Sequence, residues 1–131
     1  IDELLEVLSL SAVRNKPVHQ FSGGMKRKVN LAIGVIHQPS ILFLDEPTVG
    51  VDVQTRLDII AYLKELNRGG TTLIYTSHQL SEAESLCKKI ALINHGKIIA
   101  YDELDHLLIN HQQDGLEGLF LSLTGKDFAD S

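Results

Sequence analysis

The chain has 131 residues, of which 44% are hydrophobic and 22% charged, the balance of a soluble globular domain rather than of a disordered or membrane chain. Twelve basic against seventeen acidic residues give a net charge of -5, which argues against a nucleic-acid partner. The single cysteine, Cys87, excludes an internal disulfide and fits the reducing cytoplasm, and no apolar stretch approaches the roughly 20 residues that span a bilayer.

Two helices are predicted before any strand. Leucine and valine recur at helical spacing over residues 1–13, and Pro17 follows. This helix begins without a preceding cap, so we expect the chain to be the C-terminal piece of a longer one. Ser22 suits the N-cap of a second helix that reaches about His37. We expect its apolar face to consist of Met25, Val29, Ala32 and Ile36.

A strand-helix-strand unit is predicted next. Ile41 to Leu44 is a continuous apolar run, as expected of a strand buried on both faces of a parallel sheet, and residues 71–76 repeat that character. Between them we expect a helix over residues 55–67, ended by Gly69-Gly70. Its core-facing residues would be Leu57, Ile60, Leu63 and Leu66. This order predicts a βαβ unit.

The last part of the chain predicts a third helix, a hairpin and two short helices. Ser81 and Glu84 have capping-box spacing, so the helix should begin at Ser81 and reach about Lys88. The hairpin would pair residues 90–93 with 97–101 through the turn Asn94-His95-Gly96. The short helices would cover residues 103–109 and 116–123.

A possible phosphate site lies at the start of the second helix. Helix N-termini present unpaired N–H groups, and Ser22-Gly23-Gly24 would let a phosphate approach them closely. The alternative is that Ser22 only caps the helix. The basic run Lys26-Arg27-Lys28 is interpreted as a solvated helix face.

Asp45 and Glu46 follow the first predicted strand directly. Ligands of open α/β sheets bind at the carboxyl ends of strands, where both carboxylates would lie. One acid could hold a magnesium ion beside a phosphate, and the other could activate an attacking water. The alternative is an acidic surface turn before Pro47.

Two further residues are candidates for the same site. His78 follows the second strand and could face the same crevice, although a lone histidine there is usually structural or exposed. Asp52 is interpreted as the N-cap of the helix that follows it. The 131 residues contain no G-x-x-x-x-G-K-S/T loop, the motif that normally cradles phosphates beside such carboxylates.

The ordered motifs resemble those of an ATP-binding cassette (ABC) transporter ATPase. In chain order they are similar to its signature motif, Walker B strand, D-loop and switch histidine: Phe21-Ser22-Gly23-Gly24-Met25, Ile41 to Glu46, Val49-Gly50-Val51-Asp52 and Thr76-Ser77-His78. The residues from Leu116 to Gly125 are similar to the ending of the branch that exports drugs, ions or polysaccharides.

The resemblance implies a role for each site residue, with ATP and Mg²⁺ as cofactors. Asp45 would hold the metal, Glu46 would activate the attacking water, and His78 would contact the γ-phosphate. The residues that would contact the nucleotide of the opposite subunit, or couple the two sites, are Ser22, Gly23, Gly24 and Asp52. Met25 stands where many members have glutamine, so no phosphate contact is expected from it.

The resemblance also implies a fold, namely a partial P-loop NTPase (RecA-like) α/β sheet with flanking helices and part of the ABC helical subdomain. Residues 1–38 would belong to the helical subdomain, 39–102 to the C-terminal part of the ATPase core, and 103–131 to a helical extension. The phosphate loop and its strand would precede this sequence. That strand would separate the strands at residues 72–76 and 90–94, leaving apolar edges that favour rearrangement or pairing with another copy.

We therefore expect the C-terminal part of an ABC exporter ATPase, inactive on its own. Its partners would be a second cassette, in a homodimer or heterodimer, and transmembrane permease subunits that hold it at the inner face of the cell membrane. Two alternatives remain: a non-catalytic piece that completes a partner's ATP site, and a soluble cassette ATPase that acts on DNA or ribosomes.

Overall fold

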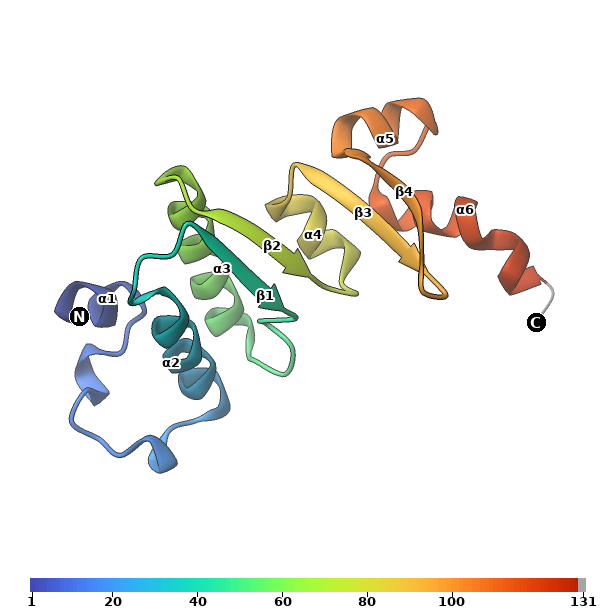
Figure 1. Cartoon of the computed structure of the whole chain (residues 1–131). Helices are drawn as coiled ribbons and strands as arrows, with labels where there is room; N and C mark the ends of the chain where they lie inside the picture. Colours follow the sequence, from blue (N-terminus) through green and yellow to red (C-terminus); the bar gives the residue numbers. More distant parts are fainter. Residues whose placement is uncertain (130–131) are drawn as a thin grey trace. The chain divides into compact units, whose positions relative to one another are not determined.

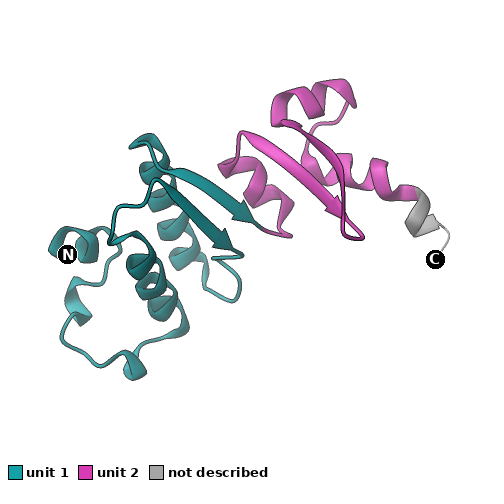
Figure 2. Ribbon diagram, viewed as in Figure 1, with its two compact units in different colours: residues 1–76 teal, residues 77–131 magenta. Residues whose placement is uncertain are grey.

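The computed structural model describes the backbone of residues 1–129 and side chains through Gly125. The chain divides into two compact units, residues 1–76 and residues 77–131 (Figure 2). Each unit contains a two-stranded sheet with helices against it, so the fold is mixed α/β, as the sequence predicts (Figure 1).

The first unit is built around a parallel strand pair. Its elements are α1 (Asp2–Val7), the 3₁₀ turns Ser11–Val13 and Val18–Gln20, α2 (Gly23–Val35), β1 (Ile41–Asp45), α3 (Val53–Arg68) and β2 (Thr72–Thr76). β1 and β2 pair from Ile41 opposite Thr72 to Asp45 opposite Thr76. The predicted βαβ unit is confirmed.

The two long helices cover one face of the β1–β2 sheet. Leu42 and Leu44 of β1 are buried on that face, and Leu42 lies next to Gly34 of α2. The other buried apolar residues of the unit are Leu8, Leu10, Leu31, Val35, Ile59 and Leu63. The opposite face exposes Ile41 and Phe43, so the prediction of a strand buried on both faces is wrong for this chain.

Helical spacing located the helices better than it located their buried faces. In α2 the buried residues are Lys28, Leu31 and Val35, whereas Ile36 is exposed. In α3 the buried residues are Thr55, Ile59 and Leu63, whereas Leu57 is exposed. The helix predicted over residues 1–13 is shorter than expected and ends at Val7. Two residues later the chain changes direction at Ser9, whose φ is 59°.

The second unit packs three helices around an antiparallel hairpin. Its elements are α4 (Leu80–Leu86), β3 (Lys89–Asn94), β4 (Lys97–Glu103), α5 (Leu104–Asn110) and α6 (Leu116–Ala129). β3 and β4 pair through the predicted turn, in which His95 and Gly96 both have positive φ. The buried core consists of Ile90, Leu92, Leu107, Leu116 and Leu119.

The capping box predicted at Ser81 does not form. The helix begins one residue earlier, at Leu80 after Gln79, and no side chain bonds its cap. The carboxylate of Glu84 instead accepts a hydrogen bond from the backbone N–H of Leu116 at the start of α6. A contact distant in sequence therefore replaces the local one.

No ladder of hydrogen bonds joins the two sheets within residues 1–129, so β2 and β3 do not pair. Over the same residues, no helix has both the length and the apolar character that crossing a bilayer requires.

Candidate nucleotide-binding site

The Ser-Gly-Gly turn opens α2 as the sequence predicts. Ser22 has extended backbone angles, and its Oγ accepts a hydrogen bond from the Met25 N–H at 3.1 Å. Ser22 and Gly23 are exposed, and a Cβ at Gly23 would meet nothing within 4 Å. The first N–H groups of a helix have no acceptor inside the helix, so this exposed end can offer them to an anion.

Gly24 has a different role from Gly23. A Cβ at Gly24 would lie 2.7 Å from Oγ1 and 3.2 Å from Cγ2 of Thr55, which is buried in the first turn of α3. Because real Cβ atoms do not approach that closely, glycine is what lets α2 and α3 come together here. The turn is therefore held against the start of α3.

The predicted carboxylate pair lies at the carboxyl end of β1. Asp45 is exposed, and one of its carboxylate oxygens, Oδ1, accepts a hydrogen bond from Thr76 Oγ1 at 2.6 Å. The Glu46 N–H donates to the backbone oxygen of Thr76 at 2.9 Å, which extends the parallel ladder by one bond. Both acids are thus fixed to the end of β2.

Glu46 also turns the chain. Its φ of 46° lies in the left-handed region, which costs a residue with a side chain about 1–2 kcal/mol. Its carbonyl accepts a hydrogen bond from the Val49 N–H at 3.3 Å, which closes a tight turn directly after the strand. Strain of this kind gathers at functional sites, and here it falls on the predicted catalytic residue.

Asp52 caps α3, as predicted from the sequence. Its Oδ1 accepts a hydrogen bond from the Thr55 N–H at 3.2 Å. Hydrogen bonding from the side chain and then the backbone of Thr55 lowers the pKa of the Asp52 carboxyl. Since Thr55 also lies under Gly24, one residue connects the cap of α3 with the glycine turn of α2.

Of the basic run, Lys28 is buried and Arg27 is partly buried, contrary to the interpretation of a solvated helix face. Lys28 is 7% exposed, and its Nζ lies 3.0 Å from Asp58 Oδ2 of α3. Arg27 is partly buried and donates a hydrogen bond to the backbone oxygen of Val49 at 3.1 Å. The helical spacing of positions 24, 28, 31 and 35 places Lys28 on the same face as the buried residues Leu31 and Val35, so its position along the helix indicates burial although its charge indicates exposure.

Arg27 and Asp45 also line a cavity of about 170 Å³ in the first unit. Apolar side chains of α2, β1 and α3 form most of its remaining wall, among them Leu31, Leu44 and Ile59. The first turns of α2 and the acidic end of β1 therefore lie close together, on the wall of the same cavity.

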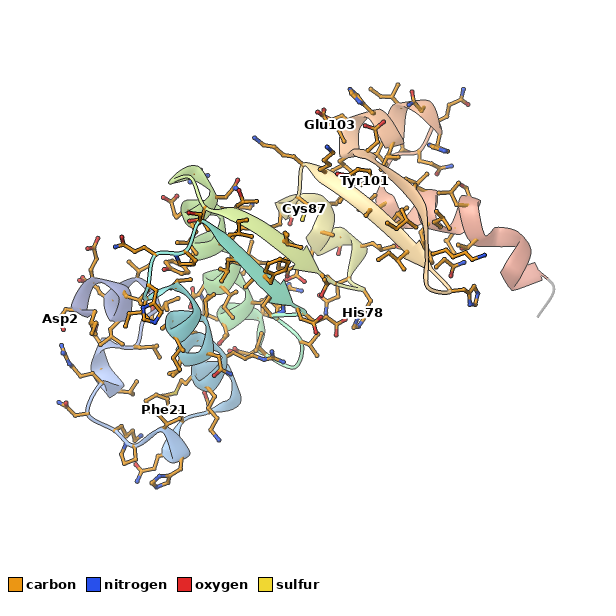
Figure 3. All side chains as sticks on the ribbon, in the orientation of Figure 1. Asp2, Phe21, His78, Cys87, Tyr101 and Glu103 are labelled. Atoms are coloured by element: carbon orange, nitrogen blue, oxygen red, sulfur yellow. The ribbon has the colours of Figure 1, made fainter. Side chains whose placement is uncertain are left out.

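The structure brings six of the seven candidates into the first unit: Ser22, Gly23, Gly24, Asp45, Glu46 and Asp52. His78 belongs to the second unit, on the loop between β2 and α4, and is exposed (Figure 3). Across the described part of the chain, no three His, Cys, Asp or Glu side chains gather into a metal-binding group.

The sequence matches a family model described as "ABC transporter" over residues 1–49. It is also 45% identical over 98 residues to the linearmycin resistance ATP-binding protein LnrL of Bacillus subtilis, across 75% of this chain and 32% of that protein. The chain belongs to the ABC transporter ATP-binding family. The ABC relatives include the cobalt import ATP-binding protein CbiO of Rhodobacter capsulatus, 37% identical over 100 residues, which are 76% of this chain and 36% of that protein.

A solved ABC structure, described as an ATP-binding subunit of an ABC transporter, has the same fold. It superposes with a TM-score of 0.82 at 25% identity, over 93% of this chain and 52% of that chain. The P-loop NTPase fold predicted from the motifs is therefore confirmed. This ABC chain spans about a third of the length of the two curated relatives, at 32% and 36%, and about half of the solved structure.

Proposed function

We propose that the chain supplies the signature turn and the catalytic carboxylates of an ABC transporter ATPase, which couples Mg-ATP hydrolysis to membrane export. The observation that carries the proposal is the arrangement within the first unit. The glycine turn of α2, the acidic end of β1 and the capped start of α3 are linked through Thr55, Thr76 and Val49.

The donor set at the end of β1 suits magnesium. A magnesium ion at a phosphate site takes one or two carboxylates together with waters and phosphate oxygens. Asp45 offers such a carboxylate, and the 2.6 Å bond from Thr76 fixes one of its oxygens. When bound, the ion would neutralise charge that develops on the transferred phosphate. Asp45 would hold it, directly or through a water.

Glu46 would act on the attacking water. A carboxylate within hydrogen-bond distance of a water can accept its proton as the water attacks phosphorus. The left-handed turn at Glu46 fixes the direction in which the backbone leaves β1, and thereby where this side chain begins. His78, which follows β2, would contact the γ-phosphate.

Ser22, Gly23 and Gly24 would serve the nucleotide of an opposite subunit. The backbone N–H groups at this exposed helix end can donate hydrogen bonds to a phosphate. Asp52, at the start of α3, would couple that contact to the chain's own site. Two cassettes would then face head to tail, as a homodimer or a heterodimer, and share two sites.

The transport partners would be transmembrane permease subunits. The chain would bind them at the inner, cytoplasmic face of the cell membrane. Export is favoured by the resistance protein that is 45% identical and by the exporter-like ending at residues 116–125. The cobalt import relative favours import instead. Transport assays in vesicles that contain the permease would decide between export and import.

We propose three functional segments: residues 1–38 as part of the helical subdomain, 39–102 as the C-terminal part of the ATPase core, and 103–131 as a helical extension. A phosphate-binding loop would come from polypeptide outside these 131 residues. The chain alone would therefore not hydrolyse ATP.

The test is to supply that loop. The residues of LnrL that precede its matched region would be fused to this chain, because 45% identity favours compatible packing. Mg-ATP hydrolysis should appear in the fusion and fall about 10²–10⁴-fold in Glu46→Gln, which keeps the shape of the side chain but cannot accept the proton. A well-folded fusion without Mg-ATP hydrolysis would contradict the proposal.

A second candidate is a non-catalytic piece that completes the ATP site of a partner. It is favoured by the lack of a phosphate loop in these 131 residues and by a glycine turn that forms independently of Glu46. This candidate predicts that Ser22→Ala with Gly23→Val lowers the partner's turnover whereas Glu46→Gln leaves it unchanged. The enzyme reading predicts a loss at this chain's own site with Glu46→Gln.

A further inference from the structure

Arg27 makes a long-range contact that the motifs do not predict. It lies one turn into α2, and its guanidinium donates to the backbone oxygen of Val49 at 3.1 Å across 22 residues of sequence. A hydrogen bond from a charged donor is stronger than one between neutral groups, and it is stronger still when partly buried. Arg27 thus holds a specific point of the loop that joins β1 to α3.

That point belongs to the same tight turn as Glu46. The Val49 N–H donates a hydrogen bond to the Glu46 carbonyl at 3.3 Å, and the Val49 carbonyl accepts the one from Arg27. Val49 therefore links Arg27 to Glu46. The turn is locally unfavourable at Glu46, whose φ of 46° lies in the left-handed region, whereas Gly50 adopts its φ of 77° without strain. A conformation of this kind needs contacts from outside the loop to hold it.

The helix that carries Arg27 is itself firmly held. Thr55 of α3 lies directly against Gly24, and the buried Lys28 pairs with Asp58 of α3 at 3.0 Å. Both contacts are within one turn of Arg27 along α2. Arg27 therefore connects a fixed helix to a strained loop.

We propose that Arg27 is a positioning residue that ties the glycine-turn helix to the loop of Glu46. A phosphate contact at Ser22 to Gly24 is then transmitted through α2 and Arg27 to the turn that places Glu46. The catalytic consequence rests on the proposed ATPase function. The contact between Arg27 and the Val49 backbone oxygen, called the tether below, does not depend on that function, because it lies within the chain.

The first test measures backbone hydrogen exchange in the full chain and in the fused cassette. Arg27→Gln should speed exchange at Val49 and Val51 about tenfold, the size expected for losing a hydrogen bond to a charged donor. Exchange at Ile59 and Leu63 in the middle of α3 should stay unchanged. Lys26→Gln is the matched control, because it removes the same charge from an exposed neighbour.

Two results would overturn the tether. One is unchanged exchange at Val49 in Arg27→Gln. The other is equally faster exchange throughout residues 1–76, which would show that Arg27 only stabilises the unit. Arg27→Lys keeps a donor that reaches a single carbonyl, so partial recovery of protection at Val49 is expected.

The second test uses ATP hydrolysis by the fused cassette. Arg27→Gln should lower kcat about tenfold and change KM less than about twofold, because a displaced Glu46 affects the transition state more than nucleotide binding. A raised KM with unchanged kcat would overturn the coupling. Lack of hydrolysis in the unsubstituted fusion would count against the proposed function instead, and the exchange result would still decide the tether.

Discussion

The two glycines of the signature turn differ in their surroundings. Gly23 has open space around it, whereas Gly24 lies against Thr55, a buried β-branched side chain with little freedom to rotate. Open space at Gly23 suits the approach of a ligand. Close contact at Gly24 suits the packing of two helices.

We expect Gly24→Ala to destabilise the first unit by about 1–3 kcal/mol, the usual cost of forcing a methyl group into a packed site. Gly23→Ala should leave the free energy of unfolding within about 1 kcal/mol of the original and can raise it, since alanine favours helix. Urea unfolding followed by circular dichroism measures both. Equal stability of the two variants would contradict the packing role of Gly24.

Asp52 gives the cap of α3 a dependence on pH. Its pKa in the folded chain is below the ordinary value of 3.8, so the unfolded chain binds more protons in that range. The stabilisation is therefore complete above about pH 4 and is lost as pH falls through the lowered pKa. Asp52→Asn keeps an acceptor oxygen but cannot ionise.

We expect the stability difference between the original chain and Asp52→Asn to shrink as pH is lowered from about 6 to about 3. The measurement is urea unfolding of both proteins at each pH. A difference that grows as the solution becomes more acidic would show that the pKa is raised instead.

At the scale of elements, α2 and α3 are joined by an ion pair that is unequally buried. The side chain of Lys28 is 9% exposed and that of Asp58 is 26% exposed. Asp58 also accepts a hydrogen bond from Gln54 at 3.0 Å, which helps to satisfy its second oxygen. Removing either partner therefore has a different consequence for the one that remains.

Asp58→Asn should destabilise the unit more than Lys28→Met, because it leaves a buried ammonium without its counter-charge. We expect a loss of about 3 kcal/mol for Asp58→Asn, whereas Lys28→Met keeps the packing and leaves a carboxylate that water can reach. Urea unfolding again provides the measurement.

The exposed ion pair between Glu65 and Arg68 is the control, since their side chains are 65% and 69% exposed. Glu65→Gln should change stability by less than about 0.5 kcal/mol. If Asp58→Asn proved equally mild, the Lys28–Asp58 pair would not be what holds α2 to α3.

At the scale of the whole molecule, the β1–β2 sheet has an uncovered apolar face. Ile41 is 54% exposed, Phe43 is 74% exposed and Ile74 of β2 is 44% exposed. These three residues lie on one side of the paired strands, since Phe43 is opposite Ile74 in the register. Exposed apolar sheet surface is an association hazard.

We expect the purified chain to self-associate as its concentration rises, and Phe43→Lys to reduce this association. Ile109→Lys is the matched control, because Ile109 is 73% exposed but lies on a helix of the second unit. Sedimentation velocity over a range of concentrations measures both variants. A chain that stays monomeric throughout would show that the sheet face is no hazard.

Local features of both fold and site were predictable from the sequence. The caps at Ser22 and Asp52, the hairpin turn and the βαβ order each depend on residues within a few positions of one another. The two carboxylates, Asp45 and Glu46, are predictable because they directly follow an apolar strand. The bonds that fix them are not, because Thr76 lies 31 residues from Asp45 and Arg27 lies 22 residues from Val49.

Burial was the least predictable property. Apolar spacing predicts that Leu57 and Ile36 are buried in the core, but both side chains are exposed. The charge of Lys28 predicts exposure, but this residue is buried. A helix of mixed composition offers more than one plausible face. Only the element packed against it selects which face is buried.

The sequence by itself determined the family, the order of the elements and the residue types at the candidate site. These features depend on the order of short motifs and on interactions between residues that are close together in the chain. Tertiary structure alone decided that Gly24 packs on Thr55, that Lys28 is buried and that Arg27 reaches the turn of Glu46. The physical reason is that these contacts join segments distant in sequence, and their energies exist only once the helices and strands have packed.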